Sequence, residues 1–174
     1  VTYLLKKSYQ LKDLKEVTFQ DLWGDNGVFT TMWIFGKTPK ILFFKKHIKN
    51  LAKSLKAYQL SKPNLKKNIL NLLRKNIKKD KKYNHLLRVA VNNRIISISL
   101  RKRIRPKLKF NLKLVNYKRI KPEFKNLKYQ VILKYLSKMD PSSSDIGLCN
   151  NKKLLESGTS NILFIKDNKI FSPI

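Results

Sequence analysis

Apolar and polar residues alternate along much of the chain with a period of two, which is the pattern of a β-strand with one buried face. Other strands are expected where a short apolar run is rich in β-branched and aromatic residues. Together these patterns predict strands around 3–5, 17–19, 27–35, 41–43, 86–91, 96–100, 108–114, 146–148, 161–165 and 170–171. Between the last two strands, Asp167 and Asn168 favour a hairpin turn.

Three segments instead follow the 3.6-residue period of an amphipathic helix. They predict helices over 44–58, over 65–77, and from just after Lys125 to 139. We expect Pro63 to end the first helix and Asn64 to cap the second. Pro141 and the serines that follow it are expected to end the third.

The mixture of strands and helices predicts an α/β (α+β) fold in two parts. We expect a small N-terminal α/β domain over 1–116, a linker over 117–124, and the first, incomplete part of a β-rich domain over 125–174. The chain has 174 residues, of which 42% are hydrophobic, so it holds enough apolar material for a core. Disorder throughout the chain is therefore excluded.

Charge is the most unusual feature of the composition, because 40 basic and 10 acidic side chains give a formal net charge of +30. Such a charge attracts phosphate groups without specificity. However, 33 of the basic residues are lysines spread over the whole chain, whereas phosphate and base recognition favours the arginine fork. The one local cluster, Arg101 to Arg105, is more readily interpreted as a solvated strand end. We therefore expect no specific nucleic-acid partner.

The cysteine count and the length of the apolar runs indicate the cellular compartment in which the protein is expected. Cys149 is the only cysteine, so no internal disulfide can form, and we expect it to fill core space in a cytoplasmic protein. The sequence offers no metal-ligating cluster, and no metal is expected. Lysines interrupt every apolar run before it reaches the roughly 18 residues that span a membrane. We expect no membrane association.

Five segments carry residues whose order matches a known family. They are GDNGVFTT at 24–31, HIKNLAKS at 47–54, FKNLKY at 124–129, LESGTSNILF at 155–164 and KDNKIFSP at 166–173. In this order they resemble motifs of the class IV aminotransferase family, the fold-type IV pyridoxal-phosphate enzymes. That family includes branched-chain and D-amino-acid aminotransferases and aminodeoxychorismate lyase. The resemblance covers nearly the whole chain and includes the spacing of 31 residues from Lys125 to Glu156.

The resemblance implies a two-domain fold-type IV enzyme with pyridoxal 5'-phosphate as its cofactor. Lys125 would form the Schiff base with the cofactor and relay a proton from the substrate carbon. Glu156 would keep the pyridine nitrogen protonated, so that the ring can withdraw electrons. Tyr129, expected one helical turn after Lys125, would donate a hydrogen bond to the phenolic oxygen of the cofactor. The other cofactor-binding residues that the resemblance implies are Asn50 and, in a turn that carries Glu156, Ser157, Ser160 and Asn161.

The sequence also departs from the family pattern. Asn50 stands where the family has an arginine that pairs with the cofactor phosphate, and an amide supplies no charge unless a neighbouring lysine does so. Thr30 stands where many aminotransferases have glutamate, and its Thr-Thr pair favours the aminodeoxychorismate lyases. Asn92 to Ile95 replace a substrate loop rich in arginine and glycine. The chain also ends, at Ile174, before the part that closes the family's cofactor domain.

We therefore expect a homodimeric enzyme that uses Lys125 to transfer an amino group between an amino acid and a 2-oxo acid. Aminodeoxychorismate lyase, which would use the same lysine in para-aminobenzoate synthesis, is the alternative. A third hypothesis is a degenerate, non-catalytic basic binding protein that keeps the fold but not the cofactor. His47 is expected to be a structural helix histidine rather than a catalytic base.

Overall fold

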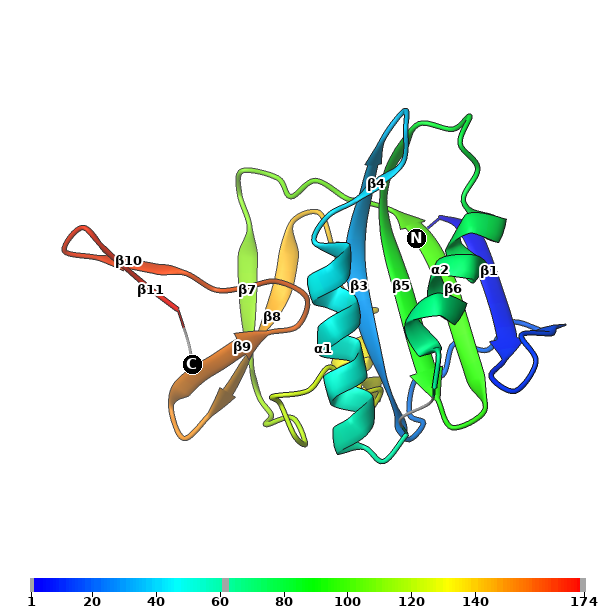
Figure 1. Ribbon diagram of the computed structural model, residues 1–174. Helices are drawn as coiled ribbons and strands as arrows, with labels where there is room; N and C mark the ends of the chain where they lie inside the picture. Colours follow the sequence, from blue (N-terminus) through cyan, green and yellow to red (C-terminus); the bar gives the residue numbers. More distant parts are fainter. Residues whose placement is uncertain (1, 61–62, 173–174) are drawn as a thin grey trace. The chain divides into compact units, whose positions relative to one another are not determined.

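The structure of the chain is a computed structural model that describes residues 2–60 and 63–172 (Figure 1). Pro173, the last residue of the fifth motif, lies outside the described residues. The contacts divide the chain into two compact units. Unit 1 contains the residues up to Arg103 together with Glu123–Lys128, and unit 2 contains Ile104–Pro122 together with the residues from Tyr129 onward. The predicted domain boundaries stay a prediction, and the contact-based units divide the chain at other positions.

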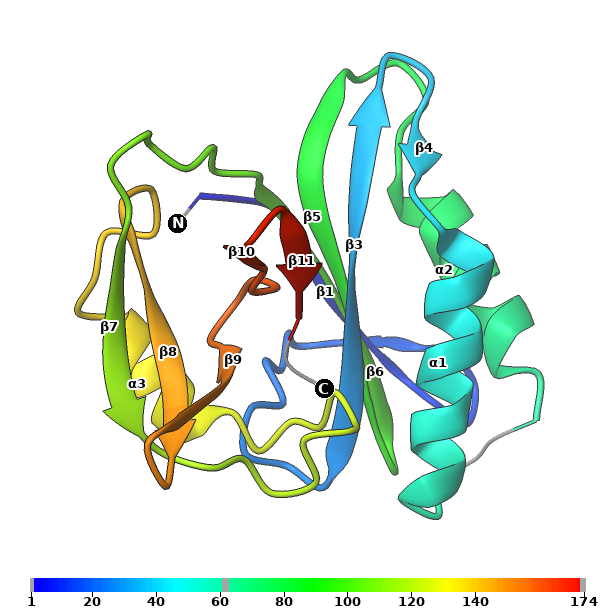
Figure 2. The ribbon, with the colours of Figure 1, turned by 90° about the vertical axis from the view of Figure 1, so that its left-hand side faces the viewer.

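Unit 1 is built on a six-stranded antiparallel sheet with the strand order β2-β1-β6-β5-β3-β4. Two helices, α1 (Phe44–Ala57) and α2 (Leu65–Asn76), cover one face of this sheet (Figures 1 and 2). The strands are β1 (Tyr3–Gln10), β2 (Glu16–Val17), β3 (Gly27–Gly36), β4 (Lys40–Ile41), β5 (Tyr83–Asn92) and β6 (Ile95–Lys102).

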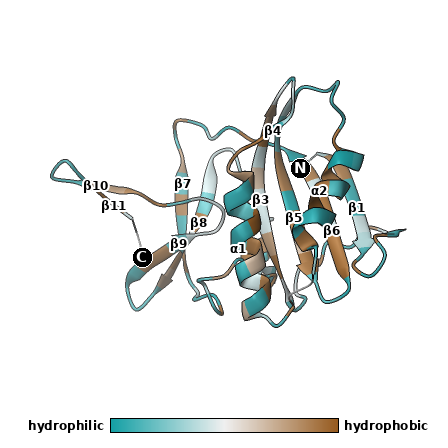
Figure 3. Cartoon of the chain, viewed as in Figure 1, coloured by the Kyte–Doolittle hydropathy of each residue, from teal (hydrophilic) through white to brown (hydrophobic). Residues whose placement is uncertain are grey.

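The core of unit 1 lies between the sheet and the two helices. Alternate residues of β3 belong to it, because Val28, Met32 and Ile34 are each at most 1% exposed. From the helices, Leu51 and Ile69 are buried to the same degree. In Figure 3 the outward surface of α1 and α2 is largely hydrophilic, whereas hydrophobic residues run along β5 and β6. The 3.6-residue period therefore predicted both helices and their buried faces correctly.

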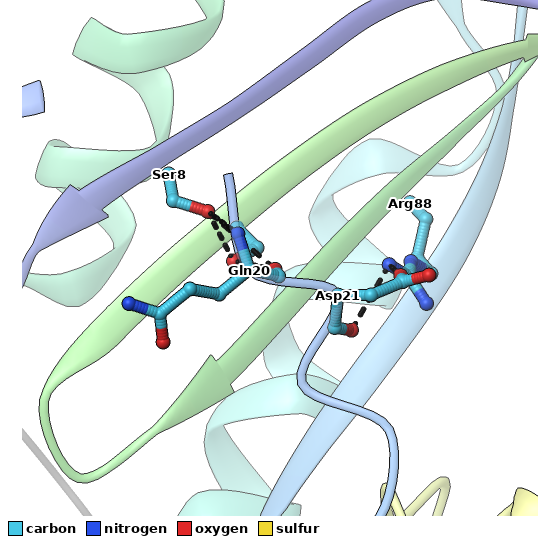
Figure 4. A network of polar contacts seen from close by, with 5 residues as sticks. Ser8, Gln20, Asp21 and Arg88 are labelled. Atoms are coloured by element: carbon cyan, nitrogen blue, oxygen red, sulfur yellow. Dashed lines mark hydrogen bonds and ion pairs between the residues drawn. The ribbon is translucent and has the colours of Figure 1, made fainter. Parts of the chain in front are cut away.

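A network of polar contacts ties the segment between β2 and β3 to the sheet (Figure 4). The N–H of Gln20 donates to Ser8 Oγ at 2.9 Å, and Ser97 Oγ donates to the carbonyl oxygen of Gln20 at 2.7 Å. The two serine hydroxyls lie 2.7 Å apart on neighbouring strands. The next residue of the segment, Asp21, forms an ion pair with Arg88 of β5. The buried hydroxyls of the sheet are thus satisfied by the segment that lies against them.

Residues 125–127 lie beside the start of β3 and are joined to it by backbone hydrogen bonds. The N–H of Phe29 donates to the carbonyl oxygen of Lys125 at 2.8 Å, and the N–H of Leu127 donates to the carbonyl oxygen of Gly27 at 2.9 Å. An antiparallel bridge accompanies these bonds. The prediction that a helix begins just after Lys125 is therefore wrong. The third helix, α3 (Gln130–Leu136), begins only after this segment has paired with the sheet.

Unit 2 contains a three-stranded sheet, a short helix and a separate hairpin. The sheet has the order β7-β8-β9, in which β7 and β8 are parallel and are connected through α3. A small apolar core between sheet and helix includes Ile132, which is fully buried. The hairpin turns at Asp167 and Asn168, both at positive φ, as predicted. The strands are β7 (Asn111–Asn116), β8 (Ser144–Asn150), β9 (Lys153–Ser157), β10 (Phe164–Lys166) and β11 (Lys169–Phe171).

Several element boundaries differ from the predicted ones. The strand predicted at 108–114 begins at Asn111, and the one predicted at 161–165 begins at Phe164. The strand β9 is not predicted, because its sequence KLLES has neither alternation nor β-branched residues. Both α1 and α3 end before the prolines that were expected to stop them. Asn64 directly precedes α2, but its side chain caps no backbone group and its φ is 58°.

The single cysteine and the basic cluster 101–105 have ordinary structural surroundings. Cys149 lies half-buried in β8 and is not part of the apolar core, contrary to the prediction. Within the basic cluster, the guanidinium of Arg103 lies 4.7 Å from the ring centre of Trp33. Part of the cluster is therefore used for packing inside unit 1. Across residues 2–60 and 63–172, the helices are too short or too polar to cross a membrane.

Candidate active site

The predicted cofactor-binding residues are distributed over both units. Lys125 and Asn50 belong to unit 1, whereas Tyr129, Glu156 and the loop 157–161 belong to unit 2. The chain passes from unit 1 to unit 2 directly before Tyr129. Each group of residues has its own supporting contacts.

Lys125 presents an exposed side chain from a backbone that is held in place. Its carbonyl oxygen accepts the N–H of Phe29 in β3, and the two residues that follow it are buried. The amine nitrogen Nζ lies 6.0 Å from the ring centre of Phe29. The ring of the preceding residue, Phe124, packs edge-to-face on the ring of Tyr58, with 6.0 Å between the ring centres. A ligand can therefore reach this amine while the backbone beneath it stays fixed.

His47 of α1 points toward β3 and belongs to the same unit as Lys125. Its Nδ1 lies 2.9 Å from the hydroxyl oxygen of Thr30. Burial lowers the pKa of His47, and the positive charges of Lys125 and Lys46 lower it further. The imidazole is therefore neutral at neutral pH, and its Nδ1 can accept the hydroxyl hydrogen. This hydrogen bond ties the His47 side chain to β3. Because the charge of Lys125 lowers the pKa of the imidazole, the protonation of His47 also depends on the candidate amine.

Asn50 lies on the exposed side of α1. Its backbone carbonyl oxygen accepts the hydroxyl of Ser54 at 2.9 Å. Lys46 and Lys53 are also exposed, and they lie four and three residues from Asn50, which places them on the same face of the helix. The positive charge that Asn50 lacks is therefore available from either lysine. A role for Asn50 in phosphate binding stays a prediction.

Glu156 is held by an arginine that the motifs did not identify. Nε of Arg119 lies 2.6 Å from Oε1 of Glu156 and Nη2 lies 2.8 Å from Oε2, which makes a bidentate ion pair. The arginine side chain is 7% exposed, that of the glutamate is 28% exposed, and Nη2 also donates to the carbonyl oxygen of Pro122 at 2.7 Å. Burial alone would lower the pKa of Arg119, but the hydrogen bond and charge of Glu156 raise it above its usual value. The guanidinium therefore stays charged and binds both oxygens of the Glu156 side chain through directed hydrogen bonds.

Tyr129 occupies the position directly before α3. The guanidinium carbon of Arg119 lies 5.4 Å from the centre of its ring, and its hydroxyl donates to the carbonyl oxygen of Gly158 at 3.2 Å. Burial raises the pKa of Tyr129; the charge of Arg119 opposes this shift and two nearby carboxylates add to it. The phenol is therefore a protonated donor at neutral pH. The prediction that Tyr129 lies one helical turn after Lys125 is wrong, because no helix joins the two residues.

The loop 157–161 starts at Ser157, the last residue of β9, and begins with a closed turn. Ser157 is buried; its hydroxyl donates to the carbonyl oxygen of Ser160 at 2.5 Å and accepts the N–H of the same residue at 2.8 Å. Ser160 and Asn161 are exposed. The predicted turn is present, but Glu156 lies in β9 rather than within it.

These groups offer two kinds of chemistry. An exposed amine can form an imine with an aldehyde, and a carboxylate whose position is fixed by an ion pair can pair with a protonated ring nitrogen. Arg119 could have been noticed as one of only seven arginines beside 33 lysines, because the arginine fork is favoured where both oxygens of a carboxylate are bound. Asp145 also contacts the loop 157–161, and no sequence signal marks it, because it lies in a mainly apolar strand.

Comparison with known families gives a match that covers most of the chain. Residues 27–174 match the family described as amino-transferase class IV. The chain belongs to the class IV aminotransferase family. The match begins inside the first of the five motifs and includes the other four, so it confirms the predicted family.

Solved structures from this family share the fold. An aminotransferase from Brucella abortus bound to pyridoxal phosphate is 15% identical, with a TM-score of 0.68 over 97% of this chain and 71% of its own. A branched-chain aminotransferase from Thermoproteus uzoniensis with norvaline is 15% identical, with a TM-score of 0.70 over 96% of this chain and 67% of its own. A Legionella pneumophila protein with the proposed activity of 4-amino-4-deoxychorismate lyase is 16% identical, with a TM-score of 0.65 over 85% of this chain and 62% of its own.

The chain thus spans 62–71% of the length of these structures. At such low identity the likeness shows the fold, and it confirms the predicted mixed α/β, fold-type IV class. The predicted enzyme class and cofactor are those of the family to which the chain belongs. Curated protein sequences give no match. The individual roles of the site residues stay predictions that rest on their contacts.

Proposed function

We propose that this chain carries cofactor-binding residues of a pyridoxal-phosphate enzyme that transfers an amino group between an amino acid and a 2-oxo acid. The observation that carries the proposal is the bidentate pair of Arg119 and Glu156. It supports an ordered carboxylate at the position that the family motif assigns to the pyridine nitrogen. The exposed side chain of Lys125 supports the other requirement, a nucleophile for the cofactor aldehyde.

Each unit by itself carries donors and acceptors of the kinds that this cofactor needs. When bound, pyridoxal phosphate supplies an aldehyde that combines with amines and a ring that withdraws electrons from the substrate carbon. Lys125 would hold the aldehyde carbon and Glu156 the ring nitrogen. The hydroxyl of Tyr129, whose single hydrogen is donated to the carbonyl oxygen of Gly158, would exchange that bond for one to the phenolic oxygen. The loop 157–161 would border the ring. Asn50, assisted by the lysines on its face of α1, would hold the phosphate.

Lys125 would serve first as an anchor and then as a base. Once a substrate amine has replaced it, its Nζ can accept the proton of the substrate α-carbon and deliver it to another position. His47 would not compete for that proton, because burial lowers its pKa. Tyr129 would remain a donor throughout, because burial raises its pKa.

Removal of pyruvate from aminodeoxychorismate is the second candidate, and the Thr-Thr pair at 30–31 favours it. Thr30 takes the place of the glutamate found in many aminotransferases, and its hydroxyl oxygen lies 2.9 Å from Nδ1 of His47. The Legionella pneumophila structure with this proposed activity has the same fold. Formation of para-aminobenzoate from aminodeoxychorismate, measured beside amino transfer to a 2-oxo acid, would separate the two reactions.

The test is to map cofactor labelling to a residue. The protein is incubated with pyridoxal phosphate, reduced with borohydride and digested, and the labelled peptide is identified by mass spectrometry. We expect an absorbance band near the visible edge and one dominant label, on Lys125, in the parent chain and in a Lys118→Ala control. Lys125→Ala should lose both signals. Because the chain has 33 lysines, labels scattered over many peptides without a band would contradict the proposal and favour a non-catalytic binding protein.

We further propose a cytoplasmic homodimer without a specific nucleic-acid partner. The family places its active site near a subunit interface, and the single cysteine suits a reducing compartment. Light scattering would give the mass in solution. Retention of RNA that disappears at moderate salt would agree with attraction by charge alone, whereas retention that resists salt would contradict this part of the proposal.

A further inference from the structure

Asp145 is a carboxylate whose burial needs an explanation. It begins the buried part of β8 and is 2% exposed, and among the described residues it is the only acidic side chain that is buried. Burying a carboxylate is costly unless hydrogen-bond donors replace the water that it loses. The contacts of Asp145 therefore indicate what its charge is used for.

The donors come from two places in the chain. The N–H of Ile146, the next residue, donates to Oδ1 at 2.8 Å. Thr159 supplies two bonds to Oδ2, one from its N–H at 3.1 Å and one from its hydroxyl at 2.8 Å. Asp145 thus connects the start of β8 to the middle of the loop that follows Glu156.

The loop lies directly against this carboxylate. The N–H of Gly158 donates to the carbonyl oxygen of Ile146 at 2.9 Å. A Cβ atom on Gly158 would lie 2.8 Å from Oδ1 of Asp145 and 2.7 Å from Cγ1 of Ile146, so glycine is required for this approach. On its other side, the carbonyl oxygen of Gly158 accepts the hydroxyl of Tyr129. The loop is therefore held between Asp145 and a residue assigned to the cofactor.

We propose that Asp145 is a positioning residue that fixes residues 157–160 in the shape needed to receive the cofactor beside Glu156. This inference rests on the proposed function. The loop consists of a glycine and three small hydroxyl residues, which have little packing of their own to order them. A binding loop that is already ordered loses less entropy when its ligand binds. Two bonds between Ser157 and Ser160 close the loop on itself, and the carboxylate of Asp145 fixes the closed loop to β8 through the two bonds of Thr159.

The experiment compares variants of the full chain by two measurements. Asp145→Asn keeps the shape of the side chain but turns an amide NH2 group toward the N–H and hydroxyl donors that now bind the carboxylate. Thr159→Val removes only the hydrogen bond from the Thr159 hydroxyl. Thr159→Ser keeps the hydroxyl and serves as the conservative rescue, and Asp167→Asn makes the same chemical change at an exposed hairpin position. The measurements are hydrogen exchange of the 157–160 amides and the dissociation constant of pyridoxal phosphate by absorbance.

For Asp145→Asn we expect exchange in the loop to be faster by roughly tenfold, since a hydrogen bond to a charged group is lost. The dissociation constant should rise by a similar factor, while Lys125 is still fully labelled at saturating cofactor. Thr159→Val should show a smaller rise in both quantities. Thr159→Ser and Asp167→Asn should match the parent chain.

The outcomes distinguish this inference from the proposed function. If the parent chain binds no cofactor but Asp145→Asn still accelerates exchange in the loop, the proposed function fails and the ordering role of Asp145 stands. If the parent chain binds cofactor and Asp145→Asn changes neither exchange nor affinity, the inference is overturned and the proposed function stands. If Asp145→Asn does not fold, Thr159→Val decides by the same two measurements.

Discussion

Replacement of Arg119 by alanine should destabilise unit 2 and leave unit 1 intact. The change removes both donors of the bidentate pair with Glu156 and the bond to the carbonyl oxygen of Pro122. It also removes the guanidinium that lies over the ring of Tyr129. All of these contacts lie inside unit 2, so the loss should stay local.

The exposures of the two partners determine the expected magnitude. Breaking a fully buried ion pair costs about 3–5 kcal/mol, whereas an exposed pair contributes roughly 0–1 kcal/mol. Arg119 is buried at 7% exposure, but Glu156 keeps 28% of its side chain in water, which can solvate the carboxylate after the arginine is gone. We therefore expect a loss of about 2–3 kcal/mol in the free energy of unfolding for Arg119→Ala. Arg119→Lys should lose about half of this, because lysine keeps the charge but not the fork.

The assay must report on unit 2. Both tryptophans, Trp23 and Trp33, belong to unit 1, so indole fluorescence follows the wrong unit. Native-state hydrogen exchange at the amides of β8 gives the free energy of opening for unit 2, and the amides of β5 give the matched value for unit 1. A double-mutant cycle with Glu156→Gln then isolates the energy of the pair.

A coupling energy below about 0.5 kcal/mol would refute the reasoning, since that is the value of an ordinary surface pair. Equal losses of protection in β5 and β8 would contradict the claim that the effect is local. A coupling energy that low would also remove the basis for the claim that Arg119 fixes the position of Glu156.

Four further predictions concern unit 1 and the protonation of the chain. Lys125→Ala should raise the pKa of His47 in an NMR titration and leave His85 unchanged, because the charge of Lys125 lowers only the former. Since the folded-state pKa of His47 lies below its usual 6.5, its unfolded state binds the proton more readily. Protonation of His47 in the unfolded state therefore lowers the free energy of unfolding as the pH falls below 6.5. In a plot of urea midpoint against pH, His47→Gln should flatten the part below pH 6.5. Gly27→Ala should cost about 1–3 kcal/mol in thermal unfolding, because its Cβ would lie 2.4 Å from a carbonyl oxygen of β5. The pKa of Asp140 is lowered chiefly by a serine backbone N–H and then by serine hydroxyls and a lysine. Asp140 should therefore stabilise the fold at pH values above its usual pKa of 3.8, and this effect should be lost as the pH falls through its depressed folded-state pKa. Asp140→Asn should remove that acid-side dependence.

The elements that could be predicted are those whose burial follows one local period. Helix α1 is an example, since Ile48, Leu51 and Leu55 are buried at helical spacing and no other interaction competes. The segment after Lys125 fails for a physical reason. Leu127 fits a helical spacing with the residues that follow, yet it is buried because its segment pairs with β3. Tertiary pairing with a distant strand has no local signature, so the start of α3 was placed too early.

The candidate site divides in the same way. Lys125, Tyr129 and Glu156 could be chosen because each stands in a motif of adjacent residues. Arg119 lies outside those motifs, and its partner follows 37 residues later in the chain. Asp145 finds its loop partner 14 residues later. Contacts of this kind depend on how β7, β8 and β9 are arranged, which a reading of local patterns does not determine.

The informative charges of this protein are its scarce ones. In a chain with 40 basic and 10 acidic side chains, an ion pair between a carboxylate and a lysine would need no special explanation. Glu156 is instead paired with one of seven arginines, through both of its oxygens. Asp145 is buried, and within residues 2–60 and 63–172 its hydrogen-bond partners include no cation. Both carboxylates are held by directed hydrogen bonds, and both border the loop 157–160. Directed bonds fix geometry, whereas diffuse attraction to many lysines does not. The net charge of +30 therefore gives little information about the reaction, whereas the two ordered carboxylates, Glu156 and Asp145, are the residues at which the proposed site can be tested.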